Sequence, residues 1–206
     1  MTADPITGPM NMPQNQDPID LLIAFEKAAD APIRAEYVEG TMIVPPQPDD
    51  HHNDAAAEFY FQLRSAGFPL AGLGSGYRVA GPEGTRSLIV PDFYVRRRRP
   101  TELDEAYRRA HRGWYSIELL ALAGEITSTN HETDTGPKYR SCAAAGVPVY
   151  ALIHRQDKKA YAFSDPLPGK DPAGAHYATR VEVDLGRRLP LPAPYPELDT
   201  APLLEG

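Results

Sequence analysis

The sequence predicts an α/β (α+β) fold with a mixed central sheet flanked by helices. Helical and extended segments alternate along the chain in three groups, each a helix followed by strands. Apolar runs at 87–95, 119–127 and 147–153 are typical of buried strands. The 206 residues suffice for one core without disulfides, and no repeat or second core is visible. We therefore expect a disordered Pro-, Asn- and Gln-rich tail at 1–17 and a single domain at 18–206.

Apolar periodicity and capping residues place the elements of the first half. We expect a helix at 18–31, a two-stranded hairpin at 35–44 and a second helix at 51–65. An extended Gly-rich segment at 70–80 and a buried strand at 87–95 should follow. Pro32 stops the first helix, and Glu39-Gly40 suits a tight hairpin turn. Asp49 or Asp50 can cap the second helix, and Gly67 follows it as a C-terminal signal.

The second half is predicted in the same way. We expect a charged, partly helical segment at 96–113, a strand at 119–127 and a helix at 134–145. Three further strands should lie at 147–153, 159–165 and 179–185. Pro137 stands in the first turn of the predicted helix, and Gly146 stands at its end. A Pro-rich tail follows the last strand.

Composition excludes several classes of protein. Cys142 is the single cysteine, which rules out an internal disulfide, suits a reducing compartment and is expected to be a small core residue. No apolar stretch reaches the roughly 18 residues that span a bilayer, and signal-peptide features are missing. We therefore expect a cytoplasmic protein without a membrane partner. The net charge of −7 argues against a strongly basic nucleic-acid-binding surface, although a local basic patch remains compatible with it.

Two carboxylates at strand ends and one lysine form the candidate site. Asp92 follows Val-Pro in one apolar run, Glu125 closes another, and Lys138 opens the helix after it. Phosphodiester hydrolysis needs a cation that neutralises charge and supplies hydroxide, and Mg²⁺ takes one or two carboxylates with several waters. We expect Asp92 and Glu125 to bind Mg²⁺ or Mn²⁺, with the carbonyl of Ile126 as a possible further ligand, and Lys138 to orient the attacking water. Because close like charges repel, loss of either acid should leave the metal-free protein at least as stable as the wild type.

Lys138 has a second interpretation. In the first turn of a helix the macrodipole disfavours a cation, and such conflicts are enriched at functional sites. Asp134 lies four residues earlier, however, so the two residues can form an ordinary ion pair on an exposed helix. Asp134 could equally position Lys138 or cap the helix, and the residues alone leave these alternatives open.

The motifs of the chain resemble, in their order and spacing, those of the Uma-type endonuclease family of the PD-(D/E)XK restriction-endonuclease superfamily. The motifs are E-Y-V-E-G at 36–40, V-P-D at 90–92, E-I-T-S at 125–128, D-x-x-x-K at 134–138, A-G-V-P-x-Y at 145–150 and R-R-L-P-L-P-A-P-Y at 187–195. The likeness spans about residues 18–203. It implies a restriction-endonuclease-like fold with a magnesium site at Asp92 and Glu125.

The resemblance also implies roles for other residues. Lys138 replaces the lysine of the usual E-x-K motif, because that position holds Thr127. Glu36 is implied as a third carboxylate at the metal, or is a strand-edge charge. His52 matches the family's histidine and would contact a phosphate, bind the metal or cap its helix.

Two positions depart from the family pattern. Cys142 stands where an aromatic residue is usual, and Gly124 stands where a bulkier apolar residue is common. Glu118 is a rival to Glu125 because it borders the same apolar run, but the E-I-T-S motif favours Glu125.

Arginines 96–99 form a basic cluster that begins four residues after Asp92. Arg96, Arg97 and Arg98 suit contacts with the phosphates of a DNA backbone, and a solvated loop is the alternative.

The leading hypothesis is a magnesium-dependent endonuclease that hydrolyses DNA. A second hypothesis is a catalytically inactive nuclease-fold module that binds nucleic acid or protein. Metal-free hydrolysis by a carboxylate pair, as in glycosidases, is disfavoured by the neighbouring lysine and the lack of an aromatic cleft signature. A two-fold homodimer is the default assembly.

Overall fold

The computed structural model describes residues 17–29, 33–82, 84–127, 131–169 and 172–204. The predicted tail at 1–17 lies outside this part of the chain except for Asp17, whose side chain caps the first helix. The helices are α1 (Pro18–Ala28), α2 (Asp50–Ser65), α3 (Glu102–Ala110), α4 (His131–Thr133) and α5 (Tyr139–Ala144), with a π-helical turn η2 (Asp134–Lys138) between the last two. Short 3₁₀ turns are η1 (Ile117–Leu119), η3 (Pro172–Gly174) and η4 (Ala201–Leu204).

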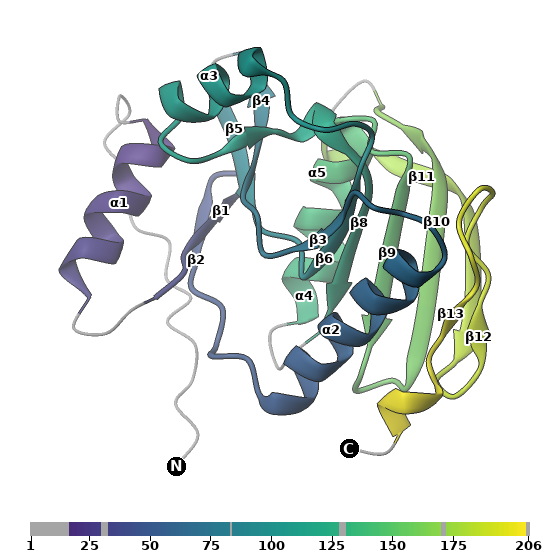
Figure 1. The fold of residues 1–206 in the computed structure, drawn as a ribbon. Helices are drawn as coiled ribbons and strands as arrows, with labels where there is room; N and C mark the ends of the chain where they lie inside the picture. The colour runs from purple at the N-terminus through teal and green to yellow at the C-terminus, as the bar shows by residue number, and fades with distance from the viewer. Residues whose placement is uncertain (1–16, 30–32, 83, 128–130, 170–171, 205–206) are drawn as a thin grey trace.

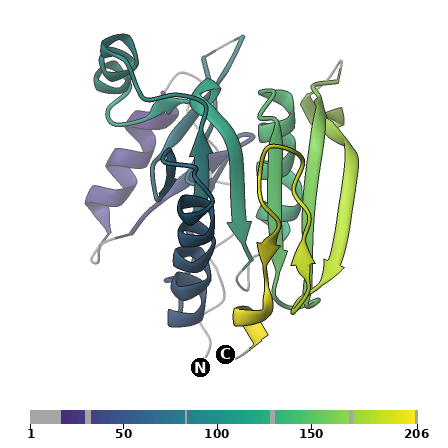
Figure 2. The same cartoon turned by 45° about the vertical axis from the view of Figure 1, so that its right-hand side comes forward.

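Two mixed sheets stand side by side in the described residues, where the sequence suggests one central sheet (Figures 1 and 2). The five-stranded sheet has the order β2-β1-β5-β4-β7, with β1 (Glu36–Val38), β2 (Thr41–Ile43), β4 (Tyr77–Gly81), β5 (Gly84–Ile89) and β7 (Tyr115–Ser116). The six-stranded sheet has the order β11-β10-β9-β8-β6-β3, with β3 (Ala71–Leu73), β6 (Phe93–Arg96), β8 (Leu120–Ile126), β9 (Val149–His154), β10 (Lys159–Leu167) and β11 (His176–Asp184). β4 pairs with β7, and β8 with β9, in parallel, whereas the other pairs are antiparallel.

Helices flank the sheets as predicted. Phe59 and Leu63 of α2 pack against one face of the six-stranded sheet, and Cys142 of α5 is buried on the other side, as expected of a small core residue. α1 covers the five-stranded sheet through Ile19 and Leu22. None of the helices in the described part of the chain is long and apolar enough to cross a membrane.

The run at 87–95 is two strands in different sheets, so its prediction as one strand is wrong. β5 ends at Ile89 in the five-stranded sheet, and β6 begins at Phe93 in the six-stranded sheet. Pro91 lacks the N–H that would continue the ladder, so the chain crosses between the sheets at this point. An apolar run indicates that its residues are buried, but it does not indicate to which sheet they belong.

The helix after β8 also differs from its prediction. It begins no later than His131, so Pro137 and Lys138 lie in its interior and not in the first turn. Pro137 has no N–H for the usual helical hydrogen bond, and the backbone forms a π-helical turn here. The hydroxyl of Tyr150 donates to the carbonyl of Asp134 over 2.7 Å and holds this turn. Lys138 therefore does not stand in the first turn of a helix, and the predicted conflict between its charge and the helix macrodipole is absent.

Local signals at shorter elements are confirmed. Glu39 and Gly40 both have positive φ, in the turn between β1 and β2. Asp49 caps α2 by accepting the His52 N–H over 2.7 Å. The Pro-rich tail additionally forms a small ribbon that the sequence did not reveal, β12 (Arg188–Leu189) with β13 (Leu198–Asp199).

Gly124 has a structural reason in this chain. It pairs with Phe93 across β8 and β6, and a Cβ at this position would overlap the Phe93 ring. We expect Gly124→Ala to lower the free energy of unfolding by about 1–3 kcal/mol through overpacking. Gly174→Ala, where a Cβ meets open space, is the matched control. Urea denaturation measures both, and recovery of Gly124→Ala by adding Phe93→Leu identifies the ring as the cause.

Candidate active site

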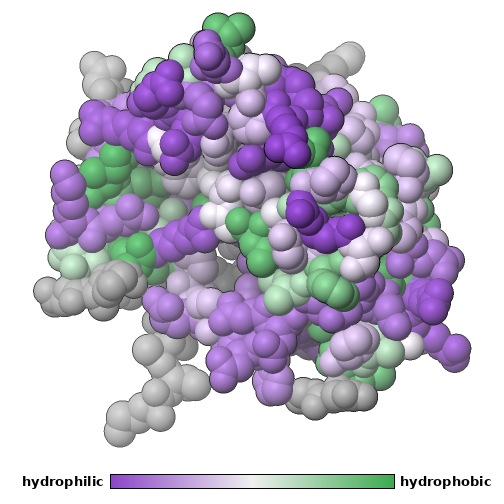
Figure 3. All heavy atoms as spheres, viewed as in Figure 1, coloured by the Kyte–Doolittle hydropathy of each residue, from purple (hydrophilic) through white to green (hydrophobic). Residues whose placement is uncertain are grey.

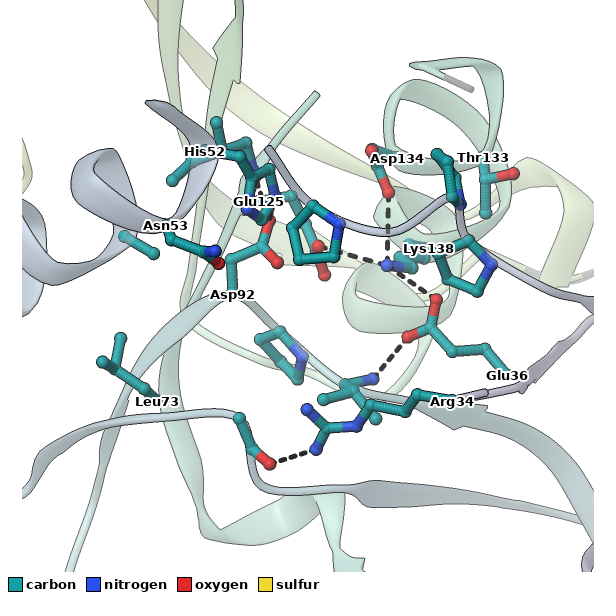
Figure 4. Close-up of a pocket in the computed structure, with 18 of the residues that line it drawn as sticks. Arg34, Glu36, His52, Asn53, Leu73, Asp92, Glu125, Thr133, Asp134 and Lys138 are labelled. Carbon is teal, nitrogen blue, oxygen red and sulfur yellow. Dashed lines mark hydrogen bonds and ion pairs between the residues drawn. The ribbon is translucent and has the colours of Figure 1, made fainter. Parts of the chain in front are cut away.

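A cavity of about 400 Å³ opens beside the crossing between the two sheets (Figure 4). Its lining includes most of the predicted site residues, namely Glu36, His52, Asp92, Glu125, Asp134 and Lys138. They come from β1, α2, the crossing, β8 and η2. Residues that lie far apart in sequence therefore meet because the chain changes sheet at this point.

Asp92 and Glu125 both line the cavity, and the charge of Asp92 acts on Glu125. Asp92 directly precedes β6, whose first residue, Phe93, pairs with Gly124 of β8. Asp92 Oδ2 accepts the backbone N–H of Ile126 over 2.7 Å, which orients the carboxylate across the strand. The sequence suggested that the carbonyl of Ile126 serves the site as a further metal ligand, whereas the contact seen here is made by the Ile126 N–H.

Glu125 is almost fully buried, with 1% of its surface exposed. Its Oε2 lies 3.1 Å from Lys138 Nζ, whereas its buried Oε1 has no hydrogen-bond partner within the described part of the chain. Burial raises the pKa of Glu125, Lys138 opposes that rise, and the charge of Asp92 adds to it. The structure therefore holds an acceptor oxygen that lacks a protein donor.

Lys138 is buried at 6% exposure, so the exposed-helix ion pair is wrong as a full account of it. Its Nζ lies 2.9 Å from Glu36 Oε2, 3.1 Å from Glu125 Oε2 and 3.2 Å from Asp134 Oδ1. Burial alone would lower the pKa of Lys138, but these carboxylates outweigh it and hold the pKa well above its ordinary value. Three acids thus hold one ammonium group at the floor of the cavity.

Glu36 connects the sheet crossing to the lysine. Its Oε1 accepts the N–H of Val90 over 2.6 Å. Its Oε2 lies 2.9 Å from Lys138 Nζ, but this buried oxygen accepts no hydrogen bond within the described residues. The metal-ligand role of Glu36 therefore stays a prediction.

Asp134 gives the metal-free protein a pH dependence. Burial raises its pKa to about 6, with Lys138 opposing and the other acids adding to the rise. Because the folded state holds this proton more tightly than the unfolded chain, the stabilisation is complete below about pH 4 and is lost as the pH rises through about 6.

We therefore expect the wild type in chelator to lose up to about 3 kcal/mol of stability relative to Asp134→Asn between pH 4 and 7. Urea denaturation at each pH measures this difference. The exposed Glu118→Gln is the control, and parallel pH profiles of wild type and Asp134→Asn would contradict the assignment.

His52 contacts Asp92 through its side chain. Its Nε2 lies 3.2 Å from Asp92 Oδ2, while its Nδ1 is buried without a hydrogen-bond partner in the described residues. Burial disfavours the charged ring, but the hydrogen bond and charge of Asp92 outweigh it and raise the pKa of His52. The helix cap comes from Asp49, so the imidazole is free of that role.

The structure does not bring the predicted arginines to the cavity. Arg96 donates to Tyr77 and Ser75, Arg97 donates to the carbonyls of Leu120 and Gly146, and Arg98 pairs with Asp104. None of the three lines the cavity among the described residues. They hold loops and the α3 cap in place.

Two further positions are settled by their surroundings. Glu118, the rival to Glu125, is exposed in η1. Thr127, at the position of the missing lysine, is buried and accepts the N–H of Arg155 over 3.0 Å.

The sequence did not single out the rim of the cavity. Arg34 donates to the carbonyl of Gly74 beside Leu73, and Pro45, Pro46 and Pro48 line the rim with it. No motif marks these residues, because their role depends on loops from two sheets meeting.

The oxygen donors at the cavity are of the type that Mg²⁺ and Mn²⁺ take. Among the described residues no group of three or more His, Cys, Asp or Glu side chains has the arrangement of a metal site. Mg²⁺ needs fewer protein ligands than three, because it binds through one or two carboxylates and keeps several waters. Asp92 and Glu125, whose Oε1 has no hydrogen-bond partner in the described residues, line the same cavity and offer two such carboxylates.

Comparisons with known proteins agree with this architecture. A putative nuclease belonging to DUF820 from Anabaena variabilis has a similar structure, with a TM-score of 0.58 and 18% sequence identity over 89% of this chain and 98% of that one. At that identity the likeness shows the fold. No curated protein matches the chain. The model of the Uma2 family, described as putative restriction endonucleases, matches residues 22–202, and the chain therefore belongs to that family.

Proposed function

We propose that this protein is a divalent-metal-dependent endonuclease that hydrolyses phosphodiester bonds of DNA. The observation that carries the proposal is the meeting of Asp92, Glu125 and Lys138 at one cavity, with Glu125 Oε1 buried and unpartnered among the described residues. Membership of a family described as putative restriction endonucleases supports the same reading.

Each residue has a distinct role in this proposal. Asp92 and Glu125 would hold Mg²⁺ or Mn²⁺, which supplies charge neutralisation and a hydroxide when bound. The N–H of Ile126 and the ring of His52 fix the orientation of Asp92. Lys138 places a positive charge at the cavity floor, where it offsets the phosphate charge and orients the attacking water.

The contacts of Lys138 also favour a second candidate function. An ammonium group has three N–H donors, and three carboxylates already surround this one at 2.9–3.2 Å. A water that binds Lys138 competes with these carboxylates for its N–H groups. A lysine that keeps all three would leave a nuclease fold that binds nucleic acid or protein without cleaving it.

Cleavage of supercoiled plasmid separates the two functions. We expect nicking with Mg²⁺ or Mn²⁺, none in EDTA, and none by Glu125→Gln. Glu118→Gln provides a matched control, because it removes an exposed carboxylate near the start of β8 without touching the cavity. Absence of cleavage by the wild type on plasmid, linear and single-stranded DNA would support the binding module.

A further inference from the structure

The acids and the lysine of the cavity differ in their exposure to solvent. Glu125 and Lys138 are nearly inaccessible at its floor, and the side chain of Asp92 is 21% exposed. Its volume of about 400 Å³ falls within the range of pockets that hold a single small ligand. Paired DNA is stiff, and bending it so that one backbone enters such a space costs about 1–6 kcal/mol. One unstacked nucleotide can enter it.

The rim further restricts what can enter. On one side, Pro45, Pro46 and Pro48 limit the conformations of the segment before α2. On the other side, Arg34 donates to the carbonyl of Gly74 and so joins the segment before β1 to the loop after β3 (Figure 4). Figure 3 shows hydrophilic residues over much of the face in view, with apolar groups at its left edge and near its centre.

The lining of this cavity carries positive charge for one phosphate, whereas Arg155 and Lys158 line an adjoining cavity that shares His52 and Ile126 with it. Tight duplex binding by phosphate contacts neutralises about 6–10 phosphates with lysine and arginine. Here the lining arginines and lysines in the described residues are Arg34 and Lys138, and Lys138 already faces three carboxylates. Arg34 is exposed, with one N–H on Gly74 and further donors directed by a planar guanidinium. It can therefore hold a single phosphate at the mouth.

We propose that the substrate is unpaired DNA, a single strand or a single-stranded end, one nucleotide of which enters the cavity. Arg34 binds a phosphate beside the scissile one, and the proline rim and Leu73 contact the base. This inference rests on the proposed nuclease function and names its substrate class.

Cleavage of matched oligonucleotides tests the substrate class. One labelled sequence is presented to the full-length protein with Mg²⁺ or Mn²⁺ as a single strand, as a blunt duplex and as a duplex with a single-stranded tail. We expect cuts in the single strand and the tail, at least about tenfold faster than in paired DNA, because unpairing costs a few kcal/mol. Equal cleavage of the blunt duplex interior would overturn the inference and leave the nuclease function standing.

Binding of the same oligonucleotides in EDTA keeps the test decisive if nothing is cleaved. Fluorescence anisotropy should show tighter binding of the single strand than of the duplex. Equal or tighter duplex binding would overturn the inference, whereas absent cleavage with single-strand preference would overturn only the nuclease function. Single-stranded RNA in both assays shows whether the sugar is discriminated, and preference for RNA over DNA would overturn the DNA assignment.

Arg34→Gln tests the phosphate contact. We expect single-strand binding to weaken by about threefold to tenfold, and its dependence on log salt to fall by about 0.7, as for the loss of one phosphate contact. Arg64→Gln is a matched control, because Arg64 is also exposed and also donates to a backbone carbonyl, that of Pro69, outside the cavity. Unchanged binding by Arg34→Gln would reject Arg34 as the phosphate ligand.

Discussion

Lys138→Met is expected to reduce DNA cleavage by about 10²–10³-fold, because a preorganised charge at the reacting phosphate stabilises the transition state. Metal affinity should survive or rise, since a neighbouring cation that repels the ion is removed. Initial rates of plasmid nicking measure the first effect, and titration with Mn²⁺ measures the second. Cleavage that continues at the wild-type rate would reject the catalytic role.

Folding must be separated from catalysis in this variant. Removing Lys138 leaves three carboxylates without their buried cation, and breaking such a pair costs about 3–5 kcal/mol. We therefore expect a markedly lower melting temperature in chelator at neutral pH, with partial recovery at low pH as the acids take up protons. The double variant Lys138→Met/Asp134→Asn has one charge fewer, so it should be more stable than Lys138→Met. If it folds and cleaves like the wild type, positioning by Lys138 is excluded.

Loss of Asp92 or Glu125 is expected to abolish both metal binding and cleavage. Each supplies half of a two-carboxylate site, and waters alone cannot replace a charged ligand for a hard cation. Calorimetric titration of Mn²⁺ into Asp92→Ala and Glu125→Gln measures the binding, and plasmid nicking measures the activity. Normal Mn²⁺ affinity in either variant would exclude that acid as a ligand.

The two variants should differ in stability, where the sequence suggested that they would behave alike. Glu125 is a buried acid whose charge is disfavoured by its surroundings, so Glu125→Gln should melt at or above the wild-type temperature in chelator. Asp92 accepts the N–H of Ile126, and Asp92→Ala leaves that donor unpaired at a cost of about 1–3 kcal/mol. A large loss of stability in Glu125→Gln would show that the contact of Glu125 with Lys138 outweighs the cost of burying its charge.

Local signals were sufficient for much of the fold. The Asp49 cap and the Glu39-Gly40 turn are short-range features, and the structure contains both of them. Where a feature depends on a distant partner, the prediction was incomplete. The Phe93 ring on the neighbouring strand occupies the space where a Cβ of residue 124 would lie, and the sequence alone does not show that contact.

The candidate site likewise has a part that the sequence predicted and a part that only the tertiary structure shows. The residue types and their order indicated that Asp92, Glu125 and Lys138 belong together, because strand ends and motif spacing are readable along the chain. The amino-acid order could not reveal that the chain changes sheet at Pro91 or that Lys138 is buried among three acids. It also could not show that Arg34 reaches Gly74 across the mouth of the cavity. These features depend on contacts between segments far apart in sequence, which form only when the two sheets pack together.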